Sequence, residues 1–115
     1  MIRELLHQEV NELTEMLHHG EDEYFTQLRS MLREKGIDPR AALLAVFLED
    51  EVGNEYGVIV CGPDGVFEYV RSVAAGAPPE FTRWSKLPDL TAAAREYPQV
   101  PVALEMLAQK ARTQS

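Results

Sequence analysis

The chain has 115 residues, of which 45 % are hydrophobic, and its 19 acidic and 11 basic residues give a formal net charge of −8. We expect a single globular domain over residues 1–115. The acidic balance disfavours direct binding to nucleic acid or an anionic membrane, because phosphates would be repelled. No apolar run predicts a membrane helix, and no signal peptide pattern begins the chain. The single cysteine excludes an intramolecular disulfide and favours a cytoplasmic protein.

Residues 1–36 predict a helical hairpin. Within residues 2–19, apolar side chains recur at spacings of four and three, which indicates one amphipathic helix with the stripe Ile2, Leu6, Val10, Leu13 and Leu17. Gly20 stands where a glycine commonly ends a helix. A second helix fits residues 22–35, because acidic residues begin this segment and basic residues end it.

Residues 42–73 predict a three-stranded antiparallel β-meander, since three apolar runs alternate with turn residues. The second run, residues 56–61, is apolar on both faces of the pleat, so we expect it at the centre with Cys61 buried. The third run, residues 66–73, mixes charged with apolar side chains, as edge strands do.

The segment 39–48 allows two interpretations. Asp38 and Pro39 are a favourable start for a helix, and the alanines that follow have helical propensity. The apolar run before a turn-rich loop instead favours a strand from about residue 42 to 50. We choose the strand.

The C-terminal third begins with a predicted connector, residues 74–89. Phe81 and Trp84 lie within it at a spacing of three, which suggests one helical turn. Residues 90–112 predict one or two short helices, the last of which is the candidate second layer on the sheet. The predicted fold is therefore α+β: a helical hairpin packed on a three-stranded meander, followed by short C-terminal helices.

Few residues suggest chemistry. His18 and Glu15 have a metal-compatible spacing, but a histidine beside a carboxylate on a helix surface is commonly a charge pair. Nothing adjacent to Cys61 lowers its pKa toward that of a nucleophile. The glycine-containing segment 62–65 joins two strands and lacks the residues of a phosphate-binding loop. We therefore expect no catalytic residues, no metal ligands and no cofactor.

The candidate partner-binding site is an acidic loop. Four carboxylates within seven positions lie beside the turn residues Gly53 and Asn54, and they are Glu49, Asp50, Glu51 and Glu55. We expect these side chains to face water without a local cation. Such a cluster either keeps the protein soluble or steers a basic partner.

The leading functional hypothesis is a non-enzymatic cytoplasmic protein-interaction domain that self-associates as a homodimer, with either the first helix or the open sheet edge at the interface. The first helix has the spacing of a helix–helix seam, and the predicted sheet has more apolar surface than the helices easily cover. One alternative is an acidic inhibitor, of the immunity or anti-defence type, that blocks a basic nucleic-acid-binding partner. A second alternative is a small enzyme or ligand-binding protein with its pocket between the sheet and Trp84.

Overall fold

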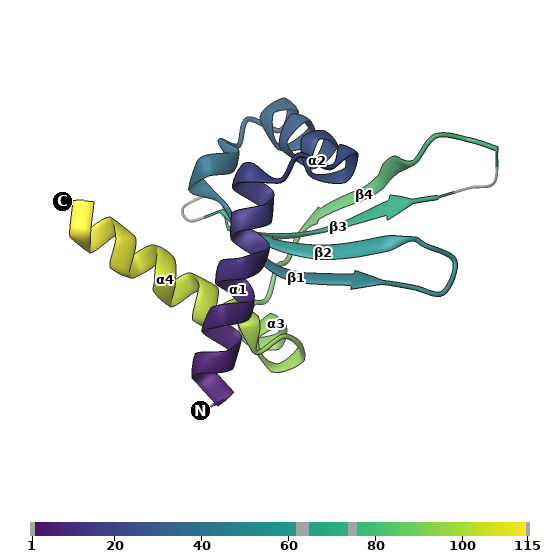
Figure 1. The fold of residues 1–115 in the computed structure, drawn as a ribbon. Coiled ribbons are helices and arrows are strands. Elements are labelled where there is room, and N and C mark those ends of the chain that lie inside the picture. Colours follow the sequence, from purple (N-terminus) through teal and green to yellow (C-terminus); the bar gives the residue numbers. More distant parts are fainter. Residues whose placement is uncertain (1, 62–64, 74–75, 115) are drawn as a thin grey trace.

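The protein forms an antiparallel four-stranded sheet with helices on both faces (Figure 1). The computed structural model describes residues 2–61, 65–73 and 76–114, except for the side chains of residues 111, 113 and 114. In chain order the elements are α1 (Ile2–His19), α2 (Glu23–Glu34), the 3₁₀ turn η1 (Pro39–Ala41), β1 (Leu43–Glu49), β2 (Glu55–Val60), β3 (Val66–Ser72), β4 (Glu80–Lys86), α3 (Leu90–Glu96) and α4 (Gln99–Gln114). The α+β class is confirmed, with one strand more than predicted.

Residues 39–48 contain both a helical turn and a strand. The carboxylate of Asp38 accepts the backbone N–H of Arg40 at 2.9 Å, and this cap begins the single turn of η1. The chain then becomes extended, and β1 begins at Leu43. The predicted strand is confirmed, because the apolar run is buried in the sheet while the helical signal lasts for only one turn.

The sheet order is β1-β2-β3-β4, so β2 lies between β1 and β3 as predicted. The side chains of β2 are apolar on both faces of the sheet because helices pack against both faces. On one face, Leu28 of α2 packs in a cluster with Ile59. On the other face, Ala103 of α4 packs in a cluster with Val58. Cys61 is buried as well, and the C-terminal helix is confirmed as the second layer.

Helix α1 packs against β1 and contributes to both clusters, with Leu17 on the α2 side and Val10 on the α4 side. Its first turn does not follow the predicted stripe, since Ile2 is exposed. No helix in the described part of the chain has both the length and the apolar character needed to cross a membrane.

The predicted connector, residues 74–89, contains strand β4, which pairs with β3. The prediction of β3 as an edge strand is therefore wrong. A β-bulge explains the error, because Thr82 is skipped in the register between the pairs Arg71–Phe81 and Val70–Arg83. The extra residue turns Phe81 and Trp84 to the same face, so their spacing of three mimics a helix. Residues 74–75 lie outside the described residues.

Candidate functional site

The acidic loop at the β1–β2 turn is built around Asp50. Its carboxylate accepts the backbone N–H groups of Val52 at 3.0 Å and Asn54 at 2.9 Å, and thereby closes the turn. Desolvation raises the pKa of Asp50, but hydrogen bonds from Asn54 and Val52 outweigh it and hold the pKa below its ordinary value. Asp50 therefore has a structural role in the loop.

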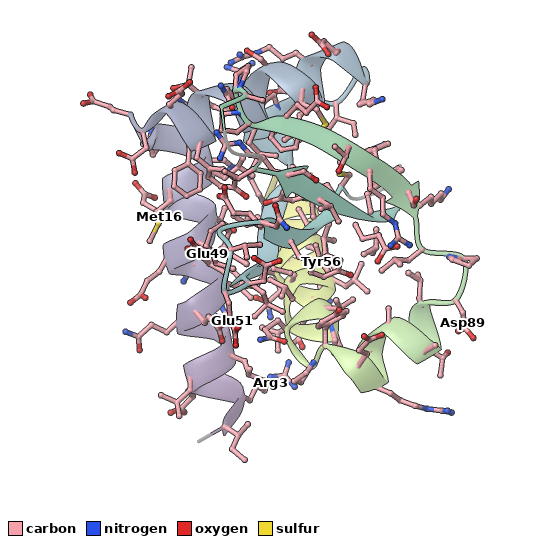
Figure 2. The ribbon with its side chains drawn as sticks, turned by 90° about the vertical axis from the view of Figure 1, so that its right-hand side faces the viewer. Arg3, Met16, Glu49, Glu51, Tyr56 and Asp89 are labelled. Atoms are coloured by element: carbon pink, nitrogen blue, oxygen red, sulfur yellow. The ribbon has the colours of Figure 1, made fainter. Side chains whose placement is uncertain are left out.

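Glu55 does not face water. It is buried, and its Oε1 lies 2.6 Å from Nη1 of Arg71 on β3, so the expectation that no local cation balances this residue is wrong. Glu49 and Glu51 are exposed, and Figure 2 shows them at the end of the sheet that faces the viewer. No ion pair within the described residues involves either one. Two of the four predicted acidic residues thus remain available to a partner.

The ion pair belongs to a polar network between α2 and the sheet. Arg71 also donates from Nε and Nη2 to Oε1 of Gln27, at 3.1 and 2.9 Å. Its guanidinium lies 5.1 Å from the ring centroid of Tyr24, whose hydroxyl is hydrogen-bonded to that of Tyr69. Burial raises the pKa of both tyrosines. Because each charged group has a partner inside the protein, this network fixes α2 on the sheet.

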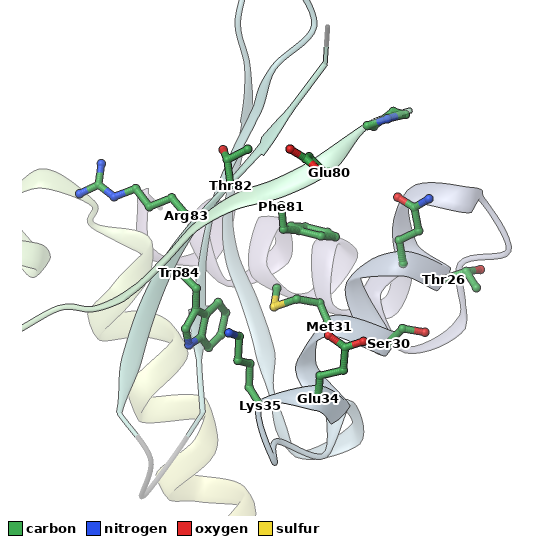
Figure 3. A pocket seen from close by; sticks show the side chains of 12 residues that line it. Thr26, Ser30, Met31, Glu34, Lys35, Glu80, Phe81, Thr82, Arg83 and Trp84 are labelled. Atoms are coloured by element: carbon green, nitrogen blue, oxygen red, sulfur yellow. The ribbon is translucent and has the colours of Figure 1, made fainter. Parts of the chain in front are cut away.

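A groove of about 580 Å³ lies between α2 and β4 (Figure 3). This volume is in the range of about 300–1,000 Å³ that is typical of ligand sites. The apolar part of its lining is Met31, Pro79, Phe81 and Trp84, and Figure 3 shows Met31 between the two rings. Trp84 is held by stacking on Phe67, with ring centroids 4.7 Å apart. The groove therefore presents ordered aromatic side chains.

The two outer edges of the sheet differ. At β1, the backbone N–H of Leu44 donates to Oγ1 of Thr14 at 3.1 Å, and Nε2 of His18 lies 2.9 Å from the carbonyl oxygen of Ala42. Helix α1 thus supplies hydrogen-bond partners for two backbone groups at the start of that edge. At β4, no other described element pairs with the outer edge, and the groove lies directly beside it.

The adjacent residues His18 and His19 each contact another group of the protein. His18 contacts the backbone as described, and His19 lies 3.7 Å from the carboxylate of Glu15, as a surface charge pair would. In the described ranges, no three side chains of His, Cys, Asp or Glu gather closely enough to hold a metal ion.

Sequence reasoning missed the buried ion pair of Arg71. It expected a pocket between the sheet and Trp84, whereas Trp84 belongs to β4 and lines a groove whose other wall is α2. Arg71 alternates with Phe67 and Tyr69, so a charged residue on that apolar face was a signal for a buried carboxylate partner. No protein-family model, curated protein or solved structure matches this chain. Its function is therefore inferred from its own residues.

Proposed function

We propose that the chain is a non-enzymatic protein-interaction domain whose binding site is the groove between α2 and β4. The observation that supports it is the position of an apolar groove directly beside an unpaired strand edge. A polypeptide can use both features, because its side chains fill the groove while its backbone meets the edge. A cytoplasmic location belongs to the same proposal.

The test blocks the groove without disturbing the core. Ser30 lines the groove from the exposed face of α2, so S30R adds volume and charge there. Gln8 is exposed on α1, and Q8R is a matched control with the same charge change. Ligands selected from a displayed peptide library should lose about tenfold or more in affinity for S30R, as for other hot-spot disruptions. Equal binding to both variants would show that the groove is not the site.

The acidic inhibitor remains a second candidate, because Glu49 and Glu51 are exposed at the tip of a hairpin that projects away from the helices (Figure 1). Such a tip could enter the basic cleft of a nucleic-acid-binding protein. This hypothesis predicts that E49K/E51K abolishes binding of that partner while S30R does not.

Self-association through the outer face of α1 is the third part of the proposal. Ile2, Leu5 and Met16 are 76 %, 67 % and 45 % exposed, and Figure 2 shows Met16 projecting away from the sheet. Apolar side chains along a helix are covered when two helices pack together.

A further inference from the structure

We infer that the groove takes its partner as an added β-strand: an extended segment pairs with the outer edge of β4, places a large apolar side chain among Met31, Phe81 and Trp84, and carries a basic residue at the Glu80 end. This inference rests on the proposed function, and it names the kind of segment that the same site recognises.

The backbone of β4 is oriented for strand addition. The N–H of Leu87 donates to the carbonyl oxygen of Val66 on β3, at 2.8 Å. Successive residues of a strand point their N–H and C=O groups to opposite sides. The backbone groups of Ser85 therefore face β3, whereas those of Trp84 and Lys86 face outward. Strand addition supplies partners for these outward groups, which no other hydrogen bond in the described residues occupies.

The side chains of the groove fit an extended segment. Phe81 and Trp84 project from β4 on the face that α2 covers, and Met31 approaches them from α2 (Figure 3). An added strand would lie about 4.8 Å from β4, and alternate side chains of it would point to this same face. One of these side chains would enter the space between the rings and the thioether.

The charge of the groove is unbalanced at one end. Figure 3 shows Glu80 beyond Phe81 at that end, whereas Glu34 and Lys35 are neighbours at the end of α2 and carry opposite charges. Glu80 takes part in no ion pair within the described residues. Arg83 also lines the groove, but its Nη2 binds Glu68 at 2.6 Å and is neutralised there. A segment with a basic residue at the Glu80 end would complement this arrangement.

A second copy of the chain fits the edge poorly. The bulge at Thr82 interrupts the ladder, which leaves the regular stretch 83–86 for pairing. Two-fold pairing of the outward-facing residues over this stretch would be centred on Ser85 and would place Lys86 of the other copy beside Trp84. A lysine, and not a large apolar side chain, would then enter the groove. The observations therefore favour a different polypeptide as the occupant.

The experiment is a selection of displayed nine-residue peptides on the full chain, followed by amide hydrogen exchange with the enriched peptides. We expect enriched sequences to alternate apolar and polar residues, with a basic residue at one end. Exchange at the N–H groups of Trp84 and Lys86 should be fast in the free protein and slow by about tenfold or more when a peptide is bound.

A charge reversal tests the basic residue. The variant E80K should prefer peptides with an acidic residue at that end, whereas E9K, at an exposed position on α1, should keep the original preference. Peptides that lose affinity for S30R without protecting Trp84 and Lys86, or that bind as helices, would overturn strand addition and leave the proposed function intact. Failure to enrich any peptide, or enrichment insensitive to S30R, would overturn both.

Discussion

Oε1 of Glu55 lies 2.6 Å from Nη1 of Arg71, across the pair of strands in which these two residues are direct neighbours. Only 8 % of the Arg71 side chain and 11 % of the Glu55 side chain are exposed. A charge so buried is tolerated because its partner is in contact, and removal of one member leaves the other unpaired in a medium of low dielectric.

We predict that E55A destabilises the protein by about 3–5 kcal/mol, as expected when one member of a buried ion pair is removed. Urea denaturation measures the change in the free energy of unfolding. E51A, in the exposed part of the same loop, is the matched control and should be close to neutral. In E55A/R71M the loss should be smaller than the sum of the two single losses. If E55A were as stable as E51A, the ion pair would have no stabilising role.

A second prediction concerns Gly57, which faces Tyr69 across β2 and β3. A Cβ at this position would overlap the tyrosine ring. We expect G57A to destabilise the protein by about 1–3 kcal/mol, the usual range for overpacking a filled core. The double variant G57A/Y69L should recover part of this loss in thermal melts. A G57A protein with wild-type stability would show that the ring moves aside freely.

Much of the fold was predictable because α1 and α2 have regular apolar periods and the first three strands are apolar runs separated by turn residues. β4 was not, since the bulge at Thr82 breaks its alternation and gives Phe81 and Trp84 the spacing of a helix. A β-bulge is defined by the pairing of one strand with its neighbour. The sequence of β4 taken alone therefore favours a helical period over a strand period.

The contacts of the acidic loop also depend on the fold and could not be predicted from the local sequence. Asp50 and Glu55 stand beside Glu51 in the sequence, and together they suggest one acidic surface. The strand register places Glu55 opposite Arg71, and the turn geometry directs the carboxylate of Asp50 to the backbone. Likewise the groove depends on the placement of α2 beside β4, which no local pattern specifies.

The tyrosines provide a third prediction. Burial raises the pKa of Tyr24, Tyr69, Tyr56 and Tyr97 above the ordinary value of about 10. The stability that each neutral tyrosine contributes to the folded protein is therefore fully present below about pH 10. It is lost as the pH rises toward the pKa of that tyrosine in the folded state. In an alkaline titration, phenolate absorbance should appear together with the loss of circular dichroism. Ionisation of all four residues near pH 10 in a fully native protein would contradict this expectation.

The acidic loop gives a fourth prediction. D50A should lower the melting temperature, because the turn loses the hydrogen bonds to Val52 and Asn54, whereas E49Q/E51Q should leave it unchanged or raise it slightly. Since the folded-state pKa of Asp50 is depressed, its contribution is present above about pH 4 and is lost as the pH falls through the folded-state value. The difference in melting temperature between wild type and D50A should therefore shrink in acid. A pH-independent difference would exclude ionisation of Asp50 as its cause.

The last prediction concerns assembly. Ile2 and Leu5 lie one turn apart on α1 and are largely exposed, so their transfer from water would favour a dimer in which two α1 helices pack together. Light scattering after size-exclusion chromatography should give twice the chain mass of 13.0 kDa at micromolar concentration. I2S/L5S should elute as a monomer, whereas L90S, which removes an exposed leucine from α3, should remain dimeric. Because this face is separate from the α2–β4 groove, S30R should dimerise like the wild type. A wild-type protein with the monomer mass at all these concentrations would end the homodimer hypothesis and leave the groove proposal unaffected.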